Sequence, residues 1–264
     1  MGVGVSLTAY GACMVWQYEI LRQKAYSMSK QFTNVHSGIR GQIHSIWKRM
    51  KLTEKVAVSI IAINTGVFLA WKVPALSRYM LKYFSSSPYS KAASSSMFFS
   101  FWSHYNTFHL LANMYVFWSF SYAAGALLGA PEMVAFFVTS GLLSNYGSYI
   151  FKALTHSRVP SLGASGAIMA ILGLTCARFP EARLSIAFVD QLIPHSFTAD
   201  NAKNGLILID VLGIIFRWRL FDHAAHLSGM LFGLFYAHYG HKMVRAGAKP
   251  IMSKWHDLRR SSDK

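Results

Sequence analysis

Residues 161–177 of this 264-residue chain read SLGASGAIMAILGLTCA, an apolar run with a small-residue turn, GASG (163–166), near its start. The turn presents one hydroxyl, that of Ser165. In lipid an unpaired backbone group costs several kcal/mol, so non-helical backbone is tolerated only where protein buries it or water reaches it. A helix over 164–177 would rise about 21 Å, which is less than the hydrocarbon core of about 30 Å. We therefore predict that the chain enters the membrane as a loop and begins this helix in a pocket open to water.

Composition places this run in a membrane protein. The chain is 53% hydrophobic, 15% aromatic and only 14% charged, and residues 92–130 contain no Lys, Arg, Asp or Glu. The basic residues behind the net charge of +16 lie between apolar segments and in the tail, without interleaved aromatic residues. This distribution is typical of membrane topology and lipid-headgroup binding, and it predicts no nucleic-acid partner. Cys13 and Cys176 lie in apolar runs and are expected to be packing residues.

Apolar segments along the chain predict an all-α, polytopic membrane protein with a six-helix core and one extra N-terminal helix. The segments are residues 3–16, 56–71, 105–128, 133–151, 164–177, 205–216 and 220–239. A signal peptide is the alternative interpretation of the first segment, but it has no obvious cleavage site, and Trp16 and Tyr18 suit a membrane interface. The predicted regions are an extra transmembrane helix (1–21), a basic linker (22–55), the core (56–240) and a basic tail (241–264).

Polar residues gather near one face of the predicted core. The segments 105–128, 164–177 and 220–239 run in the same direction in this arrangement, and each has polar residues near its start. These residues are His104, His109 and Asn113; Ser165; and His223 and His226. Polar side chains inside a membrane are costly and are functional-site candidates by default. We expect the three groups to lie at a similar depth, in one pocket.

Small residues would let the helices that carry Ser165 and His226 approach closely. The small residues are Gly166, Ala170 and Gly173 on one helix, and Ala225, Gly229 and Gly233 on the other. Across such a seam Ser165 meets His226, and a serine beside an imidazole is a nucleophile with its general base. The first amides of helix 164–177 point to where an acyl oxyanion would form, and Asn113, one turn from His109, offers a further donor.

Each of these patterns also has a structural interpretation. Ser165 alone is a common packing residue in membrane helices, and His109 alone would serve as a hydrogen-bond donor to a neighbouring helix. The four histidines of the polar groups form no HExxH spacing and have no carboxylate set beside them, so no metal and no cofactor are expected. The combination at matched depth on helices of the same direction favours catalysis.

The motifs HxxxN (109–113), GxSG (163–166) and AHxxG (225–229), in this order, resemble those of the rhomboid intramembrane serine proteases. The stretches NMYVFWSF (113–120), VPSLGASGAIMA (159–170), FDHAAHLSG (221–229) and WQYE (16–19) resemble the mitochondrial branch of that family. The likeness covers most of the chain. It implies location in the mitochondrial inner membrane, with the lipid bilayer as surroundings.

The resemblance also implies roles for individual residues. Ser165 would be the nucleophile and His226 the base, without a carboxylate. His109 and Asn113 would donate to the oxyanion together with the Ser165 amide, and His104 would support the loop before segment 105–128. The glycines of the motifs, Gly163, Gly166 and Gly229, would support the site. The substrate would be the transmembrane helix of a single-span membrane protein, unwound near small or helix-breaking residues.

Two positions depart from the family pattern. Many rhomboids have a Tyr four residues after the nucleophile, stacked on the catalytic His, and here that residue is Met169. Without that Tyr, a sulfur contact or another aromatic ring would have to orient His226. The Trp–Arg pair of bacterial members has no counterpart in residues 72–101. Asp222 and Asp210 are alternative third members of a triad: Asp222 lies one turn before His226, and Asp210 is expected to be protonated or hydrogen-bonded within the bundle.

Other interpretations remain beside the protease. One is a catalytically inactive rhomboid-fold protein that binds membrane clients, although such relatives typically lack the Ser or the His. Another is a transporter or channel, which would tolerate Ser165→Ala. No Arg-rich presequence precedes residue 3, so a short form, a processed product or a fragment that starts at the first helix is expected. The positive-inside rule and the resemblance give opposite orientations, and the sequence predicts no oligomeric state.

Overall fold

The computed structural model describes residues 2–27, 39–186 and 195–262. The described chain is almost entirely helical, which confirms the predicted all-α class. Its one small sheet pairs β1 (Arg183–Leu184) with β2 (Phe197–Thr198) in antiparallel register. The α-helices are α1 (Gly2–Ser27), α2 (Ile39–Arg49), α3 (Leu52–Ala70), α4 (Ser77–Tyr83), α5 (Ala93–Ser100), α6 (Thr107–Leu128), α7 (Ala130–Leu154), α8 (Ser165–Arg178), α9 (Ala199–Ile215), α10 (His223–Phe235) and α11 (His241–Ser262).

Capping residues set several helix starts that the apolar pattern placed differently. Asn106 accepts hydrogen bonds from the backbone N–H groups of Phe108 and His109, so α6 begins at residue 107 rather than 105. Asp222 caps α10, which begins three residues later than predicted. Thr198 caps α9, whose polar first turn extends the predicted segment by six residues. A short side-chain acceptor thus decides each boundary more sharply than hydropathy does.

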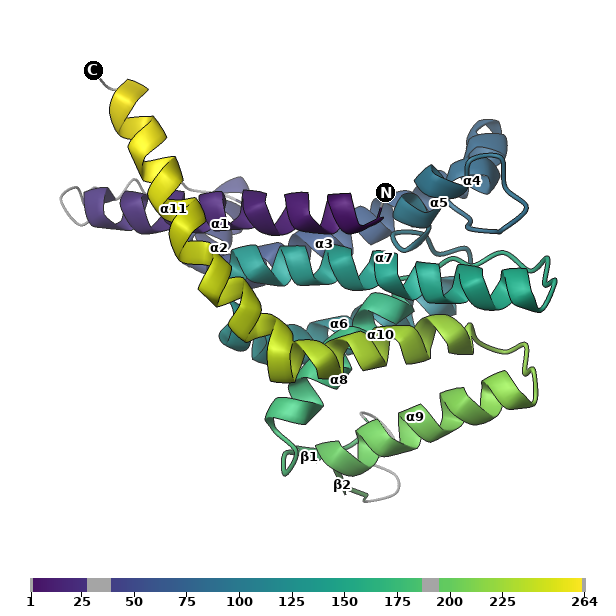
Figure 1. Ribbon diagram of the computed structural model, residues 1–264. Coiled ribbons are helices and arrows are strands. Elements are labelled where there is room, and N and C mark those ends of the chain that lie inside the picture. Colours follow the sequence, from purple (N-terminus) through teal and green to yellow (C-terminus); the bar gives the residue numbers. More distant parts are fainter. Residues whose placement is uncertain (1, 28–38, 187–194, 263–264) are drawn as a thin grey trace.

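Helix α8 forms the centre of the fold. Its residues 166–176 are all buried, and α6, α7, α9 and α10 pack around it. Figure 1 shows α8 crossing behind α10, with α7 and α9 on either side of α10. A helix buried on every side must be apolar all round, and SGAIMAILGLTCA meets that condition.

The seam between α8 and α10 is as close as the small-residue spacing predicts. A Cβ atom added to Gly229 would lie 2.0 Å from the carbonyl oxygen of Gly166, and one added to Gly233 would lie 2.1 Å from that of Ala170. Neither position can accept a side chain without a backbone shift. This contact brings the first turn of α8 against the first turn of α10, where Ser165 and His226 lie.

The N- and C-terminal helices contact each other, and the N-terminal one also packs against α7. Helix α1 packs along α7 and also contacts α11 (Figure 1). The Trp255 indole N–H donates to the carboxylate of Glu19 at 3.1 Å, and Arg259 pairs with the same carboxylate at 3.3 Å. A π-helical turn, Tyr236–Gly240, joins α10 to α11. The predicted basic tail is therefore a helix that lies on α1.

Length and hydropathy alone identify few membrane spans among the described helices. Helix α3 passes such a test by itself, and α6 with α7 passes only as a pair bent by 120° at Gly129. Helix α8 is apolar but has 14 residues. Helix α7 also buries polar side chains, among them Glu132, Ser144 and Lys152, which lower its hydropathy. Polar side chains that face the interior of a bundle lower the mean hydropathy of a helix without exposing polar groups to lipid.

Candidate active site

Ser165 and His226 form the central contact of the candidate site. Ser165 is the first residue of α8 and His226 lies in the first turn of α10. The Ser165 Oγ and His226 Nε2 atoms are 2.8 Å apart, a hydrogen-bond distance. The His226 side chain is 15% exposed, so the pair is shielded but reachable. The geometry fulfils the requirement for a nucleophile beside its base.

A pocket of about 1280 Å³ opens onto this pair. Its lining comes from α6, the end of α7, the loop 155–164, and helices α8, α9 and α10. His109, Asn113, Ser165 and His226 all belong to the lining. The nearly buried His223 lines the same pocket, so the three polar groups share it, apart from the fully buried His104.

Gly163 explains how His109 approaches Ser165. Its φ of +134° lies in a region that L side chains rarely adopt, and a Cβ there would lie 2.7 Å from His109 Cε1. The imidazole of His109 thus lies against bare backbone, one residue from Ala164 and two from Ser165. Asn113 donates its amide to the His109 carbonyl oxygen at 2.8 Å. One of its two N–H groups is used in this way and one is left for another acceptor.

His104 holds the backbone of the GASG turn. It is fully buried, and its Nε2 atom lies 3.4 Å from the donating backbone N–H of Ala164. Its ring also makes an edge contact with His109, with centroids 5.0 Å apart. The sequence placed His104 with the loop before α6; its contacts extend that prediction to the turn that presents Ser165.

The segment between α3 and α6 reaches the same turn through backbone hydrogen bonds. Ser86 and Ser161 exchange two of them, at 2.8 and 2.7 Å, and the Gly163 N–H donates to the Ser100 carbonyl at 3.0 Å. These bonds satisfy the non-helical backbone that precedes α8. They also show how the segment between α3 and α6 is fixed to the loop before α8 without the Trp–Arg pair.

Asp222 points away from His226. Its Oδ2 atom accepts hydrogen bonds from Ser148, Ser161 and Lys152, the last at 2.8 Å, while Oδ1 caps α10. Burial acts to raise the pKa of Asp222, but the charge of Lys152 and these hydrogen bonds lower it to about 2. The loop before α10 is therefore joined to α7 and to the loop 155–164 by an ionised carboxylate.

Asp210, by contrast, faces the histidines. Its Oδ1 atom lies 2.8 Å from His223 Nδ1 and 3.5 Å from His226 Nδ1. Only 2% of Asp210 is exposed. The expectation that Asp210 is hydrogen-bonded within the bundle is confirmed, and its partner is His223.

The comparisons with known proteins identify the family of the chain. Residues 92–243 match the model of the rhomboid domain. The chain belongs to the rhomboid family. It is 39% identical over 271 residues to the human presenilin-associated rhomboid-like protein, mitochondrial, covering 99% of this chain and 71% of that protein.

More distant relatives extend the similarity. This rhomboid is 30% identical over 193 residues to the Saccharomyces cerevisiae Rhomboid protein 1, mitochondrial, covering 72% of this chain and 55% of that one. It is 27% identical over 135 residues to the Bacillus subtilis Rhomboid protease GluP, covering 51% and 24%. The rhomboid domain is membrane-embedded, so the chain is a multi-pass mitochondrial membrane protein, as predicted.

Phe221 was missed by sequence reasoning and lies beside the rhomboid's catalytic candidates. Its ring centroid is 5.9 Å from that of His226, at an interplanar angle of 34°. Met169 is nearly buried in the pocket wall on α8. An aromatic ring near the histidine is thus supplied from the loop before α10. Phe221 lies in the quoted stretch FDHAAHLSG, but the sequence does not show that its ring turns toward His226.

Proposed function

We propose that this rhomboid is a serine endopeptidase that cleaves transmembrane segments of single-span membrane proteins, in the mitochondrial inner membrane. The observation that carries the proposal is the 2.8 Å contact between Ser165 Oγ and His226 Nε2 at the mouth of a large pocket. A transporter would have no need of this pairing. The pairing also favours the protease over a rhomboid-fold protein that only binds clients.

In the proposed reaction, Ser165 Oγ attacks the carbonyl carbon of the scissile peptide bond and His226 Nε2 takes the hydroxyl proton. The carbon becomes tetrahedral and its oxygen becomes an anion. When the C–N bond breaks, the departing amine takes the proton from His226. A water molecule then attacks the acyl-enzyme and gives its proton to the same Nε2 atom, which returns it to Ser165 as the acid product leaves.

The oxyanion would form beside the first turn of α8, whose N–H groups have no intrahelical partners. One N–H of the Asn113 side-chain amide donates to the His109 carbonyl oxygen. The second N–H would donate to the oxyanion. The His109 ring, which lies against the backbone of Gly163, would donate a second hydrogen bond to the oxyanion through its N–H. His104 keeps the Ala164 amide in place, and Gly166 and Gly229 allow the close approach that brings Ser165 to His226.

Labelling by a fluorophosphonate probe tests the proposal, because such probes react with activated serines. The wild-type protein, purified in detergent, should be labelled, whereas Ser165→Ala and His226→Ala should not. Ser119→Ala, which changes an exposed serine of α6, is the matched control and should label like the wild type. A transmembrane peptide placed in liposomes with the protein should be cleaved with the same dependence. A folded wild-type protein that is not labelled would refute the protease and favour the client-binding rhomboid.

A further inference from the structure

Helix α2, the short helix of the basic linker, presents an apolar stripe on its surface. The members of the stripe lie three or four residues apart and so project from one side of the helix: Ile43, Ile46, Trp47 and Met50. Ile43 is 63% exposed, Ile46 59% and Trp47 42%. Large apolar side chains gathered in this way differ from single exposed ones, which need no explanation. The stripe needs a partner that covers it.

The opposite side of α2 is polar and positively charged. The Ser45 hydroxyl donates to the Gln42 carbonyl oxygen at 2.8 Å, and the Arg49 guanidinium donates to the Ser45 hydroxyl at 3.3 Å. Lys48 is exposed on the same side. Residues 39–51 contain four Lys or Arg residues and no Asp or Glu. An apolar stripe backed by a basic side is typical of helices that lie in the surface of an acidic bilayer.

The start of α3 places α2 at the level of a membrane surface. Helix α3 is the described helix that is long and apolar enough to cross a bilayer by itself, and only two residues separate it from α2. Lys51 Nζ lies 5.5 Å from the centre of the Tyr122 ring on α6. Lys55 Nζ lies 5.6 Å from the Trp47 ring. Lysines beside Trp and Tyr at the end of a span mark the headgroup region.

The described part of the chain leaves the stripe uncovered. No described helix packs along α2 in the way that α6 packs along α3. At the headgroup level the leaflet is already next to α2, so a soluble partner or a second copy of the chain would first have to displace lipid. The position and the charge of α2 together favour the leaflet as the partner.

We propose that α2 is an interfacial helix that inserts its stripe into the leaflet at the start of α3, and that its basic residues select acidic phospholipid headgroups. The apolar face of such a helix lies about 5–10 Å into the boundary between headgroups and acyl chains. Lys48 and Arg49 stay among the phosphates on the other side. The helix thereby anchors the start of α3, at the end of α6 that lies away from His109.

Spin labels on the two sides of α2 test the proposal in the full chain, reconstituted in vesicles of phosphatidylcholine mixed with phosphatidylglycerol. Ile43→Cys and Ile46→Cys report on the stripe, and His44→Cys on the opposite side is the matched control. The two native cysteines, which are buried, are replaced by Cys13→Ala and Cys176→Ala. We expect the stripe labels to collide with oxygen more than with a water-soluble nickel chelate, at a depth of about 5–10 Å, and the control label to show the reverse.

The other collision patterns would overturn the inference. Stripe labels that the chelate reaches as easily as the control label would place the stripe in water. Stripe labels shielded from both reagents would show that protein covers it, either a second copy or another segment of this chain.

The choice of acidic lipid is tested separately. The double variant Lys48→Gln, Arg49→Gln, and vesicles of phosphatidylcholine alone, should each lower the oxygen-to-chelate ratio at the stripe at least about twofold. An unchanged ratio in both would overturn this selection. Fluorophosphonate labelling of the same preparations should match that of the wild type, because α2 contributes no residue to the pocket around Ser165. A failed depth measurement with intact Ser165 labelling therefore leaves the protease standing, and lost labelling at the expected depth leaves the interfacial helix standing.

Discussion

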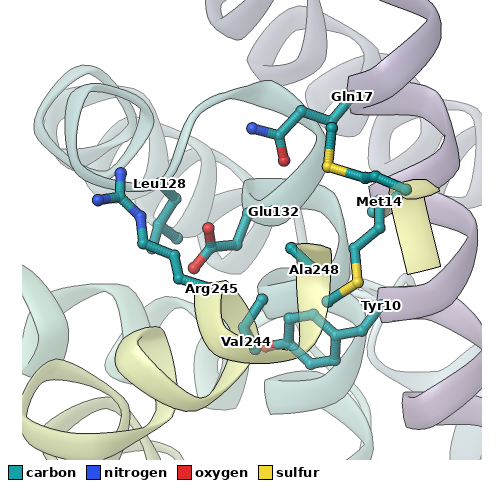
Figure 2. A pocket seen from close by; sticks show the side chains of 10 residues that line it. Tyr10, Met14, Gln17, Leu128, Glu132, Val244, Arg245 and Ala248 are labelled. Atoms are coloured by element: carbon teal, nitrogen blue, oxygen red, sulfur yellow. The ribbon is translucent and has the colours of Figure 1, made fainter. Parts of the chain in front are cut away.

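Two buried carboxylates, Glu132 and Asp210, lie near opposite ends of α10, and they differ in how well their hydrogen bonds are satisfied. At the C-terminal end, Glu132 Oε1 lies 2.8 Å from the Tyr236 hydroxyl and 2.6 Å from His241 Nδ1. The cavity beside it measures about 90 Å³, and Figure 2 shows Glu132 between α1 and α11 with Gln17 and Arg245 near its rim. At the N-terminal end, around His226, the pocket measures about 1280 Å³ and Asp210 keeps an unpaired oxygen.

The contrast separates stability from chemistry. Buried polar groups cost free energy unless they are paired, so a paired cluster serves to join helices. Glu132 joins α7 to the π-helical turn after α10 and to α11 in this way. A cluster with open donors and acceptors next to a large pocket has capacity left for a substrate. The same membrane-buried chemistry thus has a structural role at one end of the bundle and a catalytic role, as proposed, at the other.

The largest effect should come from filling the seam that assembles the open cluster. Gly229→Ala places a Cβ atom 2.0 Å from the Gly166 carbonyl oxygen, so α8 and α10 must move apart. We expect labelling and cleavage to fall more than about 100-fold, because small displacements of reacting groups cost that much, and stability to fall by roughly 1–3 kcal/mol. Gly205→Ala on α9, where nothing lies within 4 Å, is the control and should keep activity. Full activity in Gly229→Ala would show that the seam does not set the Ser165–His226 distance.

A smaller effect is expected from removing one oxyanion donor. Asn113→Ala should lower kcat for a transmembrane peptide about 10²-fold with little change in KM, since the interaction forms only in the transition state. Asn64 on α3 is a matched control, because its amide also donates to the carbonyl four residues earlier, at 2.8 Å, but it does not line the pocket. Asn64→Ala should leave kcat within about twofold. A rise in KM alone for Asn113→Ala would assign that residue to substrate binding instead.

Sequence reasoning located the open cluster well, and the reasons are local. HxxxN, GxSG and AHxxG each fix a residue type at the start of a helix; helix direction places those starts at one face, and the small residues of the α8–α10 seam let Ser165 and His226 meet. The sequence does not show which way the Asp210 and Asp222 side chains point. Whether a carboxylate faces His226 depends on how α9 is rotated against α10, which Gly213 and His223 decide through tertiary packing. The α11 contacts with Glu19 depend on a fold of the terminal segments that hydropathy does not encode.

The Asp222 network should affect stability in acid and leave the chemistry intact. Its pKa in the folded protein is about 2, below the ordinary value of 3.8, so Asp222 stabilises the fold above about pH 4 and this contribution is lost as the pH falls toward 2. The shift corresponds to roughly 2 kcal/mol. Thermal unfolding in detergent from pH 6 to pH 2.5 should therefore show the wild type converging on Asp222→Asn as the pH falls. A gap between the two that stays constant over this range would contradict an ionised Asp222.

The smallest effect on activity is expected at the satisfied cluster. Glu132→Gln keeps an accepting oxygen for Tyr236 and His241 but removes the charge, so stability should fall by about 1 kcal/mol. The maximal labelling rate of the folded protein should stay within about twofold of the wild type, in contrast to Gly229→Ala. Thermal unfolding and probe labelling of the same preparations make the comparison direct. If Glu132→Gln slowed labelling as strongly as Gly229→Ala, hydrogen-bond satisfaction would not separate the two ends of α10, and the C-terminal end would have to be coupled to the chemistry.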